Sequence, residues 1–292
     1  MRFPGGFLVA LVPAAVGGAL HAQASPGREL TVARHQDGQT ALIANLAFAG
    51  TDLVLRAATG HALYRYQAHY PSESMTAVSR YDETTSTVTL GLDPIRRPGA
   101  LRVSSGRSRG ASAVVELSPS LPTTIEGTLT DGTSDIDLGG LVLRRVDLTL
   151  RATRATLRFS RAMPGSCDGM SVRANASEVT LLQLGNSRCE FLRLTSEAGA
   201  ATLDFSGDFP ALLRVSVEAT LGTVVLRLPR DVGVRLVVDR WLANVGNTGF
   251  TRDGNTWVSE GHAGTTRKLE MALTAAAGGV RVEWIDPADA GL

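Results

Sequence analysis

The chain has 292 residues, with 29 Lys+Arg against 28 Asp+Glu and a formal net charge of +1. A balance this close to neutral argues against nucleic acid as a partner. Hydrophobic residues make up 43% of the chain, which is ample for a core, whereas aromatic residues make up 5%, which is thin for a carbohydrate-stacking surface.

The first 24 residues have the pattern of a secretory signal peptide. Arg2 precedes an apolar run at residues 7–20, and the small-x-small triplet Ala22-Gln23-Ala24 predicts cleavage after Ala24. A retained anchor is the alternative, but the run is shorter than the ~20 residues that a spanning helix needs. We expect an exported protein, periplasmic or extracellular, with no membrane span after cleavage.

From residue 134 onward the chain repeats a short pattern close to "T-L-x-F". The copies read "SDIDL", "ATLRF", "VTLLQL", "ATLDF" and "VVLRL", and a last copy, "GGVRVEW", follows after a longer interval. Aligned on one apolar position, the first five copies are 21 to 24 residues apart; the aligned residues are Ile136, Leu157, Leu181, Leu203 and Leu226. Each copy alternates apolar and polar residues, as a half-buried strand does.

A second alternating run precedes each copy, and small residues such as "NASE" and "SEAGA" separate the two. One unit is therefore strand, corner, strand and loop, and it must stack on the next unit to bury its apolar face. This favours an all-β, single-stack β-solenoid over residues 114–285, with an antiparallel sandwich as the alternative. The residues predicted to point inward are Leu148, Leu157, Phe159, Leu181, Leu184, Leu194, Leu203, Phe205, Val215, Val217, Leu226 and Leu228.

The two cysteines fit the same register. Cys167 and Cys189 are 22 residues apart, so they occupy one loop position in adjacent units. Neighbouring strands lie ~4.8 Å apart, which is within the reach of a disulfide. We predict a Cys167–Cys189 bridge, with two unlinked thiols as the alternative.

The remaining segments suggest caps and a boundary. Residues 25–92 read as an N-terminal β module, with one solenoid-like unit at 42–57 followed by two longer strands; these two strands carry Tyr64, Tyr66, Tyr70 and Tyr81. Residues 93–113 are rich in Arg, Gly and Ser and are predicted to be a linker. Residues 238–262 predict a hairpin cap, with its turn at Asp253-Gly254 and with Trp241, Phe250 and Trp257 covering the end of the stack. Residues 286–292 are predicted to be a disordered tail.

The quoted stretches "GHALYRYQAHYP", "DFSGDF", "LRLPRDVGVRL" and "GFTRDGNTWVSE" resemble toast-rack domains over nearly the whole mature chain. These domains include the C-terminal region of LiaF-type cell-wall-active-antibiotic-response proteins and related adhesin-like proteins. The resemblance implies a β-solenoid without catalytic residues and, for LiaF itself, a role in envelope-stress signalling beside a membrane partner. This chain has a signal peptide where LiaF-type proteins have transmembrane helices.

No group of residues predicts chemistry, and no catalytic, cofactor or metal residue is expected. Residues 106–110 fit the letters of a G-x-S-x-G nucleophile elbow but lack the strand and helix that the elbow requires. The carboxylates of Asp131, Asp135 and Asp137 could suit Ca²⁺, but their spacing does not match an EF-hand. The histidines and cysteines lack the spacing of a zinc site.

We therefore expect an exported, non-enzymatic interaction or scaffold module of the cell envelope whose partner is an envelope protein or polymer. A module that binds glycan or anionic lipid is the alternative, in which the Arg-rich segment could contact the anion. A polysaccharide-acting enzyme is the third and least favoured interpretation. Such an enzyme needs paired carboxylates over one groove, and no group of residues in the sequence predicts such a pair.

Overall fold

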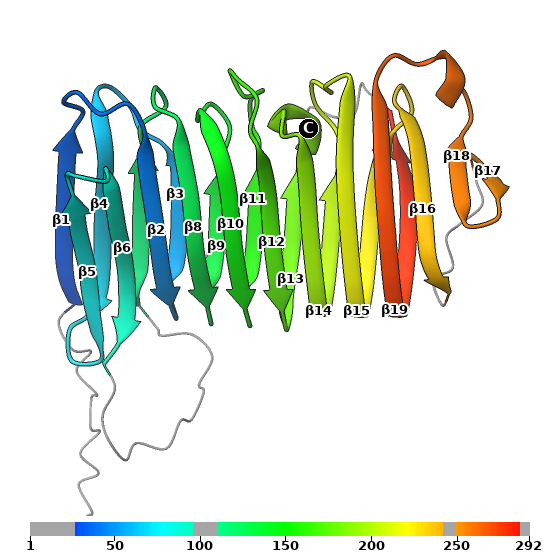
Figure 1. Ribbon diagram of the computed structural model, residues 1–292. Coiled ribbons are helices and arrows are strands. Elements are labelled where there is room, and N and C mark those ends of the chain that lie inside the picture. The colour runs from blue at the N-terminus through cyan, green and yellow to red at the C-terminus, as the bar shows by residue number, and fades with distance from the viewer. Residues whose placement is uncertain (1–26, 96–109, 242–248, 287–292) are drawn as a thin grey trace, which may run out of the picture.

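The computed structural model describes residues 27–95, 110–241 and 249–286, with the side chains of Arg240 and Trp241 excepted. The predicted signal peptide, the Arg-rich residues 96–109 and the tail beyond Asp286 lie outside these ranges. The protein is all-β: its strands form one 19-stranded hydrogen-bonded sheet that folds over on itself into two facing layers (Figure 1). The described residues include two short 3-10 helices, η1 (Leu184–Ser187) and η2 (His262–Gly264).

Three long strands run through both layers and join them. They are β14 (Phe191–Asp204), β15 (Leu212–Pro229) and β19 (Lys268–Ile285). The strands of the first layer are β5 (Met75–Asp82), β6 (Thr87–Pro94), β2 (Leu42–Ala49), β8 (Thr123–Thr130), β10 (Leu143–Arg151), β12 (Gly169–Asn175), the first halves of β14, β15 and β19, β16 (Gly233–Trp241), β18 (Thr256–Ser259) and β17 (Phe250–Asp253). We call its solvent side the front face.

The second layer lies behind the first and carries the back face. Its strands are β1 (Gly27–His35), β4 (Ala62–Pro71), β7 (Ser112–Leu117), β3 (Asp52–Ala57), β9 (Thr133–Asp137), β11 (Arg154–Arg158), β13 (Ser177–Leu182) and the second halves of β14, β15 and β19. Each turn of the chain passes down one layer and up the other, which is the path of a β-solenoid.

Within the stack the strands are parallel and in register, which excludes the antiparallel sandwich. The residues on which the five copies align pair from strand to strand: Ile136 with Leu157, Leu157 with Leu181, Leu181 with Leu203, and Leu203 with Leu226. Among the described strands, antiparallel pairs occur only toward the two ends of the stack, in β1–β4, β4–β7, β5–β6, β16–β18 and β17–β18.

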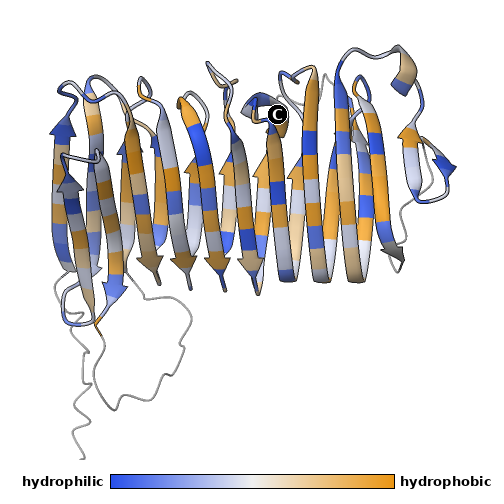
Figure 2. Ribbon diagram, viewed as in Figure 1, coloured by the Kyte–Doolittle hydropathy of each residue, from blue (hydrophilic) through white to orange (hydrophobic). Residues whose placement is uncertain are grey.

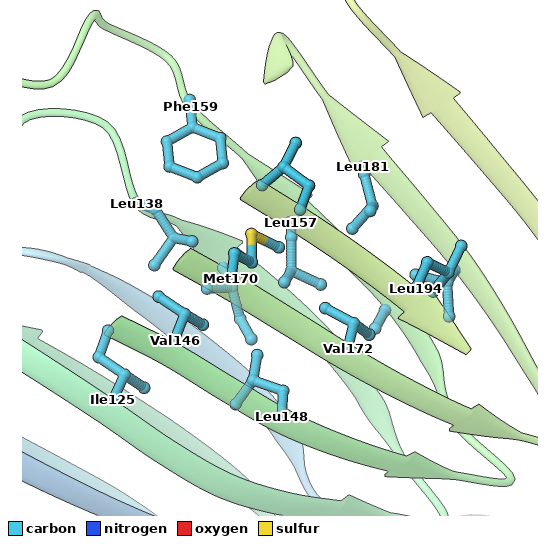
Figure 3. Packing of buried hydrophobic residues seen from close by; sticks show 14 of the residues in the cluster. Ile125, Leu138, Val146, Leu148, Leu157, Phe159, Met170, Val172, Leu181 and Leu194 are labelled. Atoms are coloured by element: carbon cyan, nitrogen blue, oxygen red, sulfur yellow. The ribbon is translucent and has the colours of Figure 1, made fainter. Parts of the chain in front are cut away.

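The core lies between the two layers and is made of aliphatic and aromatic side chains. All twelve residues that the repeat predicts to be inward are buried, each with at most 5% of its surface exposed. Figure 2 shows the alternation of apolar and polar residues along each strand. In Figure 3 the side chains of successive turns, such as Val146, Met170 and Leu194, pack in the space between the layers. Full burial of one such side chain stabilises the fold by about 1.5–3 kcal/mol.

The corners between the layers stack on one another as the strands do. In β14, β15 and β19 the chain turns at Gly199, Gly222 and Gly278, which have φ values of 124°, 130° and 133°. A Cβ at Gly222 would lie 1.8 Å from the carbonyl oxygen of Gly199, and one at Gly278 would lie 1.8 Å from that of Gly222. Only glycine permits both this conformation and this approach of backbone to backbone.

The N-terminal strands belong to the same stack, so residues 25–92 are not a module separate from residues 114–285. β2 pairs with both β6 and β8, and β3 pairs with both β7 and β9. The Arg-rich segment therefore connects β6 in one layer to β7 in the other, within a single turn of the solenoid. The sequence suggested a domain boundary there because the segment lacks periodicity. The strands on either side of the segment nevertheless pair with β2 and β3 of the same turn, so no boundary falls there.

The chain order and the spatial order also differ at the C-terminal end. β19 lies between β15 and β16, parallel to both, although it follows β16–β18 in the chain. The predicted hairpin is present as β17 and β18, with Gly254 in its turn. Phe250 packs against Trp257 and Trp284, with ring centroids 6.2 and 5.0 Å apart, and so covers this end of the core. The side chain of Trp241 lies outside the described residues.

The loops opposite the corners close the long edge of the core, and the disulfide lies among them. Cys167 and Cys189 are bonded, with 4.3 Å between their Cα atoms, and they form a parallel bridge in the register that their spacing predicts. Nearby, the Asn186 amide donates to the carbonyl of Phe159 and accepts from the N–H of Asp208. These bonds tie the loops of three successive turns together.

Replacing a corner glycine should destabilise the whole stack. We expect Gly222→Ala to lower the free energy of unfolding by at least about 2 kcal/mol, because alanine is strained at this φ and its methyl group meets the Gly199 carbonyl. Gly279→Ala is the matched control, since nothing lies within 4 Å of a Cβ there. Urea unfolding of both variants checks this, and equal stabilities would contradict it.

The disulfide should stabilise the protein by restricting the unfolded chain. Cys167 and Cys189 close a loop with a sequence separation of 22 residues, for which chain entropy gives about 3 kcal/mol. Urea unfolding of the Cys167→Ser/Cys189→Ser double variant should therefore show a loss of this size. An unchanged midpoint in the variant would show that the loop is already restricted without the bond.

Candidate functional site

The back face carries rows of ion pairs. Arg56 donates to Glu116 on the neighbouring strand at 2.8 Å, and Arg227 pairs with Glu283 at 3.1 Å. Beside them lies a row of threonines, in which Thr156 pairs with Thr180 and Thr180 with Thr202. Charges that neutralise each other across strands give a solvated surface, as the sequence predicts for the polar positions of the repeat.

The front face is hollowed over β2, β8, β10 and β12. The hollow, which we call the front groove, has a volume of about 490 Å³. The side chains of Asn45, Thr89, Thr128 and Thr149 bring amide and hydroxyl groups to it. The small side chain of Ala47 also lines the groove and leaves room above its floor. Strand alternation directs these side chains outward, because residues i and i+2 share a face of the sheet.

Charged residues of both signs lie along the front groove. Asp147 is directly opposite Glu126 on the adjacent strand, and Arg145 Nε donates to Asp147 Oδ2 at 2.5 Å. Arg173 lines the groove on the next strand. Among the described residues, no ion pair is formed by Glu126 or Arg173, so both are available to a ligand.

An exposed phenyl ring lies beside the groove. The side chain of Phe191 on β14 is 42% exposed. Among the described residues, three large apolar side chains are exposed, and Phe191 is one of them. Its ring lies over Gly169 of the preceding turn: a Cβ at Gly169 would be 2.3 Å from Phe191 Cζ. A glycine at this paired position thus lets the ring lie across the neighbouring strand. Arg193 lies two residues further along β14, on the same face.

A second hollow continues the front face on the other side of Phe191. It has a volume of about 340 Å³ and is lined by residues of β15, β19 and β16, including Arg214, Arg235 and Glu270. Arg214 is also the residue paired with Phe191 across β14 and β15. Groove, ring and second hollow therefore follow one another along the stack. The sequence did not indicate this arrangement, because it depends on which strands lie side by side.

The residues considered at the sequence level for chemistry do not come together. Asp135 pairs with Arg158, and Asp137 accepts from the backbone N–H groups of Gly139 and Ser160, so both carboxylates are used in structure. In the described ranges no cluster of three metal-ligating side chains occurs. Of the G-x-S-x-G segment only Gly110 is described. Within the same ranges no helix has the length and apolarity that a membrane crossing requires.

The tyrosines of the N-terminal end serve the core. Tyr66 Oη donates to the Gly91 carbonyl at 2.7 Å, and burial raises the pKa of Tyr66. Burial also raises the pKa of Tyr64, whose ring packs against Tyr81 at 6.0 Å. The guanidinium of Arg34 lies 4.2 Å from the centre of the Tyr81 ring and pairs with Glu83. This cluster covers the end of the stack.

Comparisons with known proteins give structural likeness only at low identity. No family model and no curated protein matches the chain. A candidate cell adhesion protein from Clostridium sporogenes is similar at 16% identity and a TM-score of 0.45, covering 89% of this chain and all of that one. A candidate adhesin from Bacteroides fragilis is similar at 12% identity and a TM-score of 0.41, with the same coverage. The likeness to LiaF-type proteins stays a prediction from the sequence.

Proposed function

We propose that the protein is an exported, non-enzymatic binding module of the cell envelope that holds its ligand on the front face. The front groove is the observation that carries this proposal. It brings amide, hydroxyl, carboxylate and guanidinium groups from adjacent strands to one open surface. Such a surface offers many hydrogen bonds to an extended ligand and contacts it from one side.

The rest of the fold supports a binding role. Backbone hydrogen bonds hold every strand of the stack in register, so the groove is preformed and a ligand loses little affinity to ordering the protein. The disulfide supports export, because such bonds persist mainly in oxidising compartments. A role in envelope stress is supported only by the sequence resemblance to LiaF-type proteins.

A polysaccharide-acting enzyme is the second candidate, favoured by the facing carboxylates of Glu126 and Asp147. Glycoside hydrolysis needs two such groups, one of which is kept protonated by an apolar environment. Glu126 is exposed and Asp147 is paired with Arg145, so neither has that environment. We therefore favour binding. Shortening of a bound polysaccharide by the wild-type protein, and its loss in Glu126→Gln, would establish the enzyme instead.

Filling the front groove should abolish binding to envelope material. We expect Thr149→Trp to weaken the retention of envelope fractions at least about tenfold, since the indole occupies the space of the ligand. The measurement is co-sedimentation of the purified protein with cell-wall and membrane fractions.

Thr180→Trp is the matched control, because Thr180 is an equally half-buried threonine on a central strand of the back face. It should bind as the wild type does. Equal binding by Thr149→Trp and the wild type would remove the front face as the site, and with it the proposed function.

A further inference from the structure

We propose that the front face around Phe191 is a binding site for an acidic polysaccharide, with Phe191 stacking on a sugar ring and Arg173 and Arg193 binding its carboxylates. This inference deepens the proposed function and rests on it, because it names the class of ligand and the way the ligand lies.

Phe191 supplies the apolar surface that a sugar ring needs. The faces of a pyranose carry C–H groups, and these pack against the face of an aromatic ring. A phenylalanine that is 42% exposed at the first position of a strand in the middle of the stack leaves apolar surface in water unless a ligand covers it. Gly169 opposite it lets the ring lie against the neighbouring strand rather than extend into solvent.

Arg173 and Arg193 supply the positive charge. They lie on adjacent strands, with Arg193 paired to Ser171 and Arg173 paired to Thr195, so their Cα atoms are about 8 Å apart on the diagonal. Both are exposed, and among the described residues neither has a carboxylate within ion-pairing distance. Elsewhere on the same face Arg145 and Arg214 do pair with acidic residues. Guanidinium groups bind carboxylates through two parallel hydrogen bonds.

The hollows on both sides of Phe191 indicate a polymer rather than a single sugar. The front groove reaches Arg145, which lies two strands from Phe191 in the same row, or about 10 Å away at the spacing of the sheet. The second hollow begins at Arg214, the next residue of that row. A chain laid along the stack, across the strands, contacts all three places. Figure 1 shows β10, β12, β14 and β15 side by side along this path.

The charges also set the position of the ligand's acidic groups. Glu126 and Asp147 would repel a carboxylate over β8 and β10, so the hydroxyl groups of neighbouring sugars lie there. The carboxylates lie over β12 and β14, where the unpaired guanidinium groups are. A neutral glucan would gain the stacking on Phe191 but not these ionic hydrogen bonds.

Affinity electrophoresis of the purified protein in gels that contain polygalacturonate, dextran or polyphosphate tests the proposal, with phosphatidylglycerol vesicles as a separate sedimentation arm. Polygalacturonate should retard the protein, while dextran, polyphosphate and vesicles should have at least about tenfold weaker effects. Phe191→Ala and the double variant Arg173→Ala/Arg193→Ala should each weaken polygalacturonate binding by about tenfold.

Two controls separate the site from general effects of charge and folding. Phe191→Tyr keeps an aromatic face and should bind as the wild type does. Arg154→Ala/Arg281→Ala removes the same charge from the back face and should also leave binding unchanged. The proposal is overturned if the front-face and back-face arginine double variants weaken polygalacturonate binding equally. It is also overturned if Phe191→Ala binds polygalacturonate as the wild type does. Stronger binding to dextran, polyphosphate or vesicles than to polygalacturonate overturns it as well.

The two proposals fail in different ways. If envelope material is retained by the wild type and lost in Thr149→Trp while polygalacturonate has no effect, the front face is a binding site and the acidic polysaccharide is the wrong ligand. If retention does not depend on Thr149, the front face itself is not the site.

Discussion

Each strand in the middle of this stack takes its hydrogen bonds from strands in the preceding and following turns, so the backbones must approach at one fixed spacing throughout. That spacing is possible only if the corners stack as closely as the strands. Gly199, Gly222 and Gly278 meet this condition with backbone conformations and contacts that leave no room for a side chain. Earlier corners turn at residues such as Ala152 and Ala176, which adopt left-handed conformations with φ of 49°. Local strain at the corners is offset by the burial of a continuous apolar core.

The regular backbone has a consequence for the surface. Side chains at equivalent positions of successive turns fall into straight rows. Each row on a face is made of one residue from each turn, and these residues set its chemistry. On the back face these residues are threonines and alternating charges that satisfy one another. On the front face they include Ala47 and Ala272, which are small and leave hollows between larger polar neighbours. A binding surface can therefore arise from a few small residues in an otherwise uniform sheet.

The repeat predicted the fold of the central and C-terminal turns well, because alternation and small corner residues are local signals. It identified the inward residues, the corner positions and the register in which Cys167 meets Cys189. It identified residues 42–57 as a solenoid-like unit but placed them in a separate module, and it did not predict that β2 and β3 continue the same stack or that β19 lies between β15 and β16. Those pairings join segments far apart in the chain. The front groove was missed for the same reason, since Asn45 lies opposite Glu126 only through the pairing of β2 with β8. The sequence did not indicate that Phe191 is exposed, because the alternating pattern predicts that apolar residues point inward.

The place of β19 bears on how the molecule is made. Its first half completes the hydrogen bonds of both β15 and β16, yet it follows β15 to β18 in the chain. Turns nearer the N-terminus can pair as they leave the ribosome, but β15 and β16 hold open edges until β19 enters between them. Open edges are sites at which strands of other molecules can add. Insertion of β19 thus becomes the step that converts a stack with a gap into a closed one, and the exposure to mispairing is greatest before that insertion.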